Sequence, residues 1–404
     1  MNFEIPSSLA RIFGLLLLLA LALTITGSSL EATPEKQVGY LGRPGVVMIE
    51  TIYSGGFVDG NGDATIALEY GGEEYVWNLP QMEIGSQGSG FVISSNGYIV
   101  TNAHVVDTKE EEIEQNFAYQ TSVYLVDRWN EYIEENSIET DLSDATLISY
   151  LYRALISDQF TLKHTKEIKV YFGGSSTPTR AITAEIRKSS QEQFWESYDQ
   201  DNPSRVVKHR SGKDVAIIKV AGFNNLPIVT LGDSDEVEVG DKVIVIGYPG
   251  VARASQMYVL SSETDYVPTV TSGIISAQKR LPDGSAILQT DASIYHGNSG
   301  GPAFNADGEV IGIATYASVA QLDSGQMINV QGFNFLIPMS EARTFIRELN
   351  VDTTPSNTTE SFERGLDYYW NGQYTQARQE FDRILAIDPG NQYAQEYSRM
   401  TLKA

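Results

Sequence analysis

Cysteine is absent from the 404 residues of the sequence. This absence excludes a thiol nucleophile, a metal site built from thiolates and any disulfide framework, so the folded chain depends on core packing for its stability. Histidine is also scarce. A site that needs an imidazole can draw on four residues, His104, His164, His209 and His296.

Positive charge is the second shortage. The chain has 28 basic and 52 acidic residues, which gives a formal net charge of -24. Such a surface repels the phosphates of nucleic acids and anionic lipid headgroups, so we expect neither as a partner. Hydrophobic residues make up 42% of the chain, a value typical of a packed globular protein rather than a disordered one.

An apolar run lies near the amino terminus, at residues 12–25, between Arg11 and the small polar stretch 26–29. Its length of about 14 residues suits the core of a signal peptide and is short of the ~20 needed to span a bilayer. We predict that residues 1–27 are a signal peptide or, if uncleaved, a membrane anchor, followed by a polar lead-in at 28–43. Either reading places the rest of the chain outside the cytoplasm, in the periplasm, the cell envelope or the medium. Any membrane contact is then expected through this segment alone.

Short strand-like runs recur along most of the chain, separated by turns rich in Gly, Asn and Asp. This pattern predicts a mostly β protein, either a barrel or a sandwich. The runs lie at residues 46–52, 90–94, 98–100, 168–172, 181–186, 215–220, 242–246, 269–276, 286–289, 310–315 and 332–337.

Two segments have a helical rather than a strand-like period. Residues 109–159 are acidic, with apolar residues about one turn apart, and predict a helical hairpin inserted into the β domain. The insertion is either a solvated elaboration or a lid beside a cleft. Residues 349–358 read as a linker, and residues 359–404 as a small helical module.

The helical module has the spacing of one tetratricopeptide repeat. Small residues at Gly365 and Ala377 allow two helices to approach, and Tyr368, Tyr374 and Phe381 are expected to fill the seam. A plain helical hairpin is the alternative. Because one repeat buries its seam on one side only, we expect this module to dock on its own protease domain, on a second copy of the chain or on a protein partner, and we favour the last two.

The strongest chemical signal is the sequence Gly-Asn-Ser-Gly-Gly at residues 297–301. A serine hydroxyl becomes a useful nucleophile when a base takes its proton and hydrogen-bond donors stabilise the oxyanion that forms. The glycine at 297 allows the backbone N–H groups of Gly297 and Ser299 to point at one spot. We therefore predict Ser299 as a nucleophile beside an oxyanion hole.

A base and a carboxylate should complete this site. His104 follows the strand-like run 98–100, whereas His296 is too near Ser299 along the chain to face it; His164 and His209 have polar neighbours and are expected to be solvated. Asp214 opens a strongly apolar strand, where an unpaired charge is costly. With 52 acidic residues in the chain, chemistry alone does not select Asp214.

The sequence resembles the HtrA/Deg branch of chymotrypsin-like serine proteases over residues 44–345. The resemblance is carried by Gly-Ser-Gly-Phe at 88–91, Thr-Asn-Ala-His-Val-Val at 101–106, Asp-Val-Ala-Ile at 214–217, Leu-Gly-Asp-Ser at 231–234 and the segment around Ser299. It implies two six-stranded antiparallel β-barrels in a protease domain at 44–348. It also implies a His104, Asp214 and Ser299 triad in the cleft, acting on polypeptides without a cofactor or a metal.

The same resemblance suggests the substrate pocket. Ser293 would form its floor, and Ala314, Thr315 and Tyr316 its wall. A neutral floor disfavours a buried Lys or Arg, so we expect cleavage after small or medium apolar residues. The chain departs from the family at Tyr295-His296, where Asn-Pro is usual, and after residue 348, where repeat-like helices stand in place of a PDZ module.

The residues therefore favour a serine endopeptidase for processing or quality control of proteins outside the cytoplasm. The alternative from another class is a catalytically silent scaffold of the same fold that binds peptides or partners through its carboxyl-terminal helices. An esterase is a further alternative. The complete triad argues against the scaffold.

Overall fold

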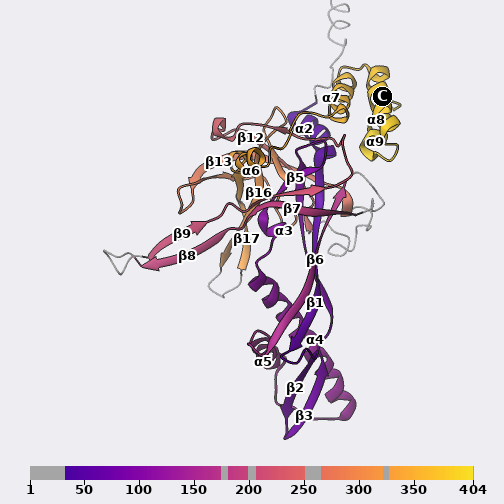
Figure 1. Ribbon diagram of the computed structural model, residues 1–404. Coiled ribbons are helices and arrows are strands. Elements are labelled where there is room, and N and C mark those ends of the chain that lie inside the picture. The colour runs from indigo at the N-terminus through magenta and orange to yellow at the C-terminus, as the bar shows by residue number, and fades with distance from the viewer. Residues whose placement is uncertain (1–31, 174–180, 199–205, 251–264, 322–326, 404) are drawn as a thin grey trace, which may run out of the picture. The chain divides into compact units, whose positions relative to one another are not determined.

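The computed structural model describes residues 32–173, 181–198, 206–250, 265–321 and 327–403 (Figure 1). The predicted signal segment, residues 1–27, lies outside the described residues. Within the described ranges, no helix is long and apolar enough to cross a membrane. The chain divides into two compact units, one at Val38–Glu360 and one that contains Ser361–Ala404.

The first barrel closes in the strand order β1-β4-β5-β10-β7-β6, and every pairing is antiparallel. Each of the first six strand-like runs predicted from the sequence lies within or overlaps one of its six strands. The strands are β1 (Val46–Asp59), β4 (Met82–Val92), β5 (Tyr98–Thr101), β6 (Phe160–Phe172), β7 (Ile182–Ser190) and β10 (Val215–Val220).

The second barrel closes in the order β12-β13-β14-β17-β16-β15, with the short β11 (Thr230–Leu231) added parallel to β16. Two six-stranded antiparallel barrels are the fold that the sequence predicts, and the structure confirms it. The strands are β12 (Lys242–Gly247), β13 (Thr269–Arg280), β14 (Ala286–Thr290), β15 (Pro302–Phe304), β16 (Glu309–Gln321) and β17 (Met327–Pro338).

Several strands are apolar on both faces because one face packs inside a barrel and the other packs between the barrels. Side chains alternate along a strand, so Val47 and Ile49 of β1 lie in the core of the first barrel while Val46 and Met48 lie in a cluster shared with the second. Strand β12 shows the same division. This shared cluster of buried side chains holds the two barrels together.

The insertion forms a lobe with a core of its own. Helices α4 (Glu110–Asn136) and α5 (Asp144–Leu155) confirm the predicted helical hairpin. They pack on the outer parts of β1 and β6 and on the hairpin of β2 (Thr65–Tyr70) and β3 (Glu73–Asn78), where Phe57, Phe117 and Trp129 are buried. Figure 1 shows this lobe extending from one end of the first barrel.

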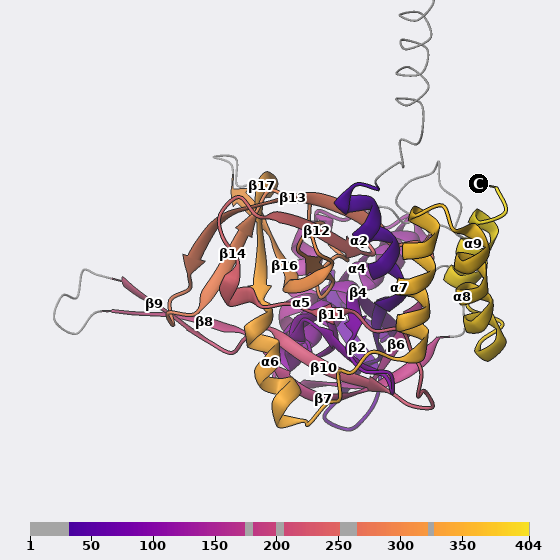
Figure 2. The same ribbon diagram turned by 90° about the horizontal axis from the view of Figure 1, so that it is seen from above.

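The remaining elements of the larger unit are short. A hairpin of β8 (Gln193–Tyr198) and β9 (Val206–Ser211) extends away from the barrels (Figure 2), and α6 (Met339–Glu348) follows β17. The others are α2 (Pro34–Gly42), α3 (Ala103–Val106) and the 3₁₀ turns Arg43–Gly45 and Ser234–Glu236.

Three helices, α7 (Asn357–Trp370), α8 (Tyr374–Ile387) and α9 (Gln392–Met400), make up the carboxyl-terminal part of the chain. A Cβ atom at Gly365 of α7 would lie 2.5 Å from the ring of Phe381 on α8, so the predicted close approach is present. Phe381 also meets Tyr397 of α9 edge-on, with ring centroids 5.6 Å apart. The expectation that Tyr374 fills the seam is wrong, because this residue begins α8 and is 36% exposed.

Candidate active site

His104 and Asp214 come together because β5 and β10 are antiparallel neighbours. Thr101, the last residue of β5, is paired with Ala216, so the chain leaving β5 and the chain entering β10 lie side by side. The Asn102 amide donates to the backbone oxygen of Asp214 at 2.9 Å. His104 then follows in the single turn of α3, beside the carboxylate.

The His104 and Asp214 side chains form a hydrogen-bonded pair. Nδ1 of His104 lies 2.9 Å from Oδ2 of Asp214, and the backbone N–H of His104 donates to Oδ1 at 3.0 Å. The carboxylate is 3% exposed, whereas the imidazole is 48% exposed. Asp214 therefore fixes the ring through one nitrogen and leaves the other edge of the ring accessible.

The surroundings of His104 also change its acidity. Burial alone would lower its pKa, but the hydrogen bond that His104 makes to Asp214 and the negative charge of Asp214 outweigh burial, with smaller contributions from Glu192 and Glu112. The pKa of His104 is therefore raised above its ordinary value of 6.5. This direction is expected where a neighbouring carboxylate stabilises the imidazolium form.

Thr315 is a third group on the same carboxylate. Its hydroxyl donates to Oδ2 of Asp214 at 2.9 Å, and its side chain is buried. A buried carboxylate is costly unless its oxygens accept hydrogen bonds, and here His104 and Thr315 supply them from both barrels. From the sequence, Thr315 is predicted in the pocket wall, and its contact with Asp214 is not predicted, because a single hydroxyl residue in β16 is a very weak signal.

The loop that carries Ser299 is held by Ser89 of β4. The Ser89 N–H donates to the oxygen of Ser299 at 2.8 Å, and its hydroxyl donates to the oxygen of Gly297 at 2.6 Å. The same hydroxyl accepts from the N–H of Tyr248 at 2.9 Å. Gly297 has φ +98°, and a Cβ there would lie 2.3 Å from the oxygen of Tyr248, so glycine is required.

The peptide between His296 and Gly297 is turned so that its N–H remains available. The His296 oxygen accepts from the N–H of Gly250 at 2.6 Å, and the N–H of a trans peptide points opposite to its oxygen. Across the described part of the chain, neither the Gly297 N–H nor the Ser299 N–H donates to a protein acceptor. Both can therefore serve an incoming oxyanion.

The Ser299 hydroxyl donates to the backbone oxygen of Thr315 at 3.1 Å. No hydrogen bond between Ser299 and His104 is present among the described residues. The Ser299 side chain must rotate about its Cα–Cβ bond before its hydroxyl can donate to His104. Catalytic hydrogen bonds are often absent before substrate binds, so this geometry is compatible with a nucleophile at rest.

The other sequence-predicted residues lie at different places. Ser293 is exposed and accepts from Thr271 through its backbone oxygen, Ala314 is fully buried in the core of the second barrel, and the Tyr316 side chain lies outside the described residues. Their assignment to a substrate pocket stays a prediction. No cluster of metal-ligating side chains occurs in the described ranges.

The remaining histidines lie away from this pair. His164 contacts Glu110 at 2.7 Å and stacks on Phe117; its side chain is 14% exposed, so the expectation that it is solvated is wrong. His209 pairs with the Ser197 hydroxyl at 2.7 Å.

The similar proteins described below are all proteases or peptidase domains. Residues 177–313 match the family described as "Trypsin-like peptidase domain". A "Probable periplasmic serine endoprotease DegP-like" of Halomonas elongata is 31% identical over 274 residues, which cover 67% of this chain and 36% of that protein. The "Magnetosome formation protease MamE" of Paramagnetospirillum magneticum is 36% identical over 169 residues, covering 40% of this chain and 20% of that protein.

A solved structure, "HtrA-type protease AlgW with decapeptide", is 23% identical with a TM-score of 0.40, covering 78% of this chain and 66% of that one. The chain thus spans about a third of the length of the Halomonas relative, since 36% of that protein is covered.

Proposed function

We propose that this chain is a serine endopeptidase that hydrolyses peptide bonds in polypeptides. Ser299 is its nucleophile, His104 its general base and acid, and Asp214 the group that orients His104. The observation that carries the proposal is the 2.9 Å pairing of His104 Nδ1 with a buried carboxylate, next to a serine loop with two free N–H groups. The similarity to a trypsin-like peptidase domain and to DegP-like serine endoproteases supports it.

The proposed mechanism gives each proton a position. Nδ1 of His104 faces Asp214 and carries the hydrogen, so Nε2 has the lone pair that accepts the proton of Ser299. The Ser299 oxygen then attacks the scissile carbonyl, and the oxyanion is stabilised by the N–H groups of Gly297 and Ser299. His104 returns the proton to the leaving amine, and water resolves the acyl-enzyme through the same base.

Cleavage of casein by matched variants tests these roles. Ser299→Ala and His104→Ala should lower turnover by orders of magnitude, and Asp214→Asn by about 10⁴-fold, because the wrong tautomer is then favoured. Ser149→Ala, which removes a hydroxyl at an exposed position of α5, serves as the control. Near wild-type cleavage by Ser299→Ala would disprove the assignment.

The substrate preference follows from the pocket residues proposed on sequence grounds, Ser293, Ala314, Thr315 and Tyr316. None carries a charge that would neutralise a buried Lys or Arg side chain. We therefore expect cleavage after small or medium apolar residues. Sequencing the products of a peptide library checks this, and a majority of Lys or Arg at the cut contradicts it.

The cellular location and the domain organisation of the chain are also proposed from its sequence and its relatives. Relatives named as periplasmic proteases support export, and residues 1–27 are the proposed signal peptide or anchor. Residues 44–348 form the proposed protease domain, with the insertion at 109–159 and a linker at 349–358. Residues 359–404 form a proposed tetratricopeptide-like module that binds a protein partner or a second copy.

A further inference from the structure

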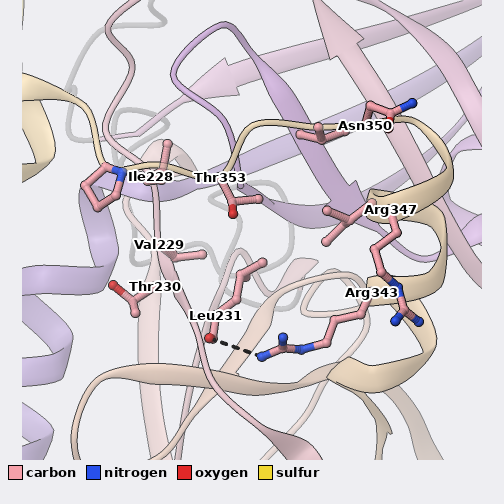
Figure 3. Close-up of a pocket in the computed structure, with 11 residues that line it drawn as sticks. Ile228, Val229, Thr230, Leu231, Arg343, Arg347, Asn350 and Thr353 are labelled. Atoms are coloured by element: carbon pink, nitrogen blue, oxygen red, sulfur yellow. Dashed lines mark hydrogen bonds between the residues drawn. The ribbon is translucent and has the colours of Figure 1, made fainter.

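A pocket of about 720 Å³ lies away from the proposed catalytic residues, on the larger unit (Figure 3). It is bounded by the segment 228–231 that contains β11, by one face of α6 and by the chain that leaves α6 at residues 350–355. This volume is within the range of about 300–1,000 Å³ that is usual for small-molecule sites. None of the proposed triad or oxyanion residues lines it.

Two arginines of α6, Arg343 and Arg347, line this pocket one helical turn apart. Figure 3 shows Arg343 reaching to Leu231, where its guanidinium donates to the backbone oxygens of Leu231 at 3.4 Å and Gly232 at 2.6 Å. Its Nε is buried without a hydrogen-bond partner. Arg347 is exposed and lies in the last turn of the helix, so its charge is available to a ligand.

The carboxylates that neighbour these two arginines on α6 pair with other residues. The acidic neighbours on α6 are engaged with lysines outside the pocket, Glu341 with Lys213 and Glu348 with Lys188. Within the described residues, neither arginine forms an ion pair. Both arginines therefore present positive charge to the pocket without a carboxylate partner among the described residues, and the oxygens of an anion would supply one.

The rest of the lining is largely apolar. Ile228, Val229 and Ile346 are buried and belong to the core clusters beneath the pocket. Leu231 and Val351 are half-buried and Pro355 is exposed, so these three offer apolar surface to a ligand. The other lining residues are polar: Thr230, Asn350 and Thr353. Apolar walls gain by excluding water from an apolar ligand body, whereas the arginine forks match the oxygens of a carboxylate or a phosphate. The polar and apolar parts therefore select for different ends of one molecule.

We propose that this pocket binds a small amphipathic anion, with its carboxylate or phosphate head group on Arg343 and Arg347 and its apolar body against the 228–231 wall. The site is separate from the proposed protease function. Its test measures binding rather than cleavage, so the two proposals can fail independently.

Isothermal titration calorimetry of the full chain with octanoate, octyl phosphate, 1-octanol and acetate at constant ionic strength tests the site. Octanoate or octyl phosphate should bind more tightly than 1-octanol, which lacks the charge, and than acetate, which lacks the apolar body. Tighter binding of octanoate identifies a carboxylate ligand, and tighter binding of octyl phosphate a phosphate ester. If neither anion binds better than 1-octanol, the proposal is overturned.

Arg347→Gln is the decisive variant, because the Arg347 side chain forms no hydrogen bond or ion pair within the described residues. Loss of a charge-assisted hydrogen bond should weaken binding of the anionic probe by about ten-fold to a hundred-fold. Arg153→Gln removes an equal charge from an exposed position of α5 and should leave binding unchanged. Equal weakening by both variants would show a general effect of net charge and would contradict a built site.

Discussion

Thr315 connects two members of the proposed triad. Its hydroxyl donates a hydrogen bond to Asp214, and its backbone oxygen accepts a hydrogen bond from the Ser299 hydroxyl. The first contact stabilises the carboxylate that orients His104, and the second holds the nucleophile in its resting rotamer. Thr315 lies in β16 of the second barrel, and it makes both contacts at the interface between the barrels.

Thr315→Val should therefore lower kcat/KM for a small peptide by about ten-fold, because a hydrogen bond to a charged group contributes about 1.5–3 kcal/mol. The apparent pKa of the acid limb should rise, since Asp214 keeps more of its negative charge beside His104. Thr183→Val, at an exposed position of β7, is the control. Unchanged kcat/KM and pH profile in Thr315→Val would remove this residue from the account.

The pH dependence of activity follows from the raised pKa of His104. Catalysis needs the neutral imidazole, so kcat/KM falls as the pH drops through this pKa, and the raised value places that fall above pH 6.5. Glu112→Gln removes one negative charge that favours the imidazolium, so the acid limb should move to lower pH. Glu131→Gln, near the far end of α4, should not move it, and a shift in the opposite direction for Glu112→Gln contradicts the electrostatic explanation.

Single residues differ in how well the sequence predicts them. His104, Asp214 and Ser299 lie in recognisable motifs, and the structure brings His104 and Asp214 together. The Thr315 hydroxyl reaches a carboxylate 101 positions away, which no local pattern indicates. The sequence also does not predict that Arg343 and Arg347 of α6 line a pocket. Whether they have carboxylate partners depends on how distant segments of the chain pack.

Among the elements, strands buried on both faces were the easiest to predict. The outer halves of β1 and β6 are not predicted, because they lack a continuous apolar run: half-buried and exposed residues follow one another in β6, and buried and half-buried residues in β1. Their more buried side meets the insertion rather than the barrel. The hairpins β2–β3 and β8–β9 were missed as well. Their strands are paired only within each hairpin in the described ranges, so the apolar signal is short.

The lobe around α4 should unfold more easily than the barrels when its core is damaged. Phe117→Ala removes a fully buried ring, which costs about 3–5 kcal/mol in a packed core. Hydrogen exchange of α4 amides should speed up while β10 amides are little changed. Tyr119→Ala on the same helix, where the ring is 51% exposed, is the matched control. Equal acceleration in α4 and β10 would show that lobe and barrels unfold together.

At the scale of the whole molecule, the larger unit contains every residue of the proposed catalytic mechanism. A chain that ends at Glu360 keeps Val38–Glu360 and lacks the helical residues 361–404. Its kcat/KM for a small peptide should stay within about two-fold of the full chain, because the triad's hydrogen bonds lie within the larger unit. Casein cleavage or self-association should change if the helices bind partners. Loss of small-peptide cleavage in a folded truncated chain would contradict this division of labour.

Labelling with a fluorophosphonate probe measures whether Ser299 is an activated nucleophile. We expect one label per chain, found on Ser299 by peptide mass analysis, greatly slowed in His104→Ala and absent from Ser299→Ala. Labelling should also weaken as the pH falls through the raised pKa of His104. A folded wild-type chain that takes no label, or a Ser299→Ala variant that is labelled as fast as the wild type, would contradict the account.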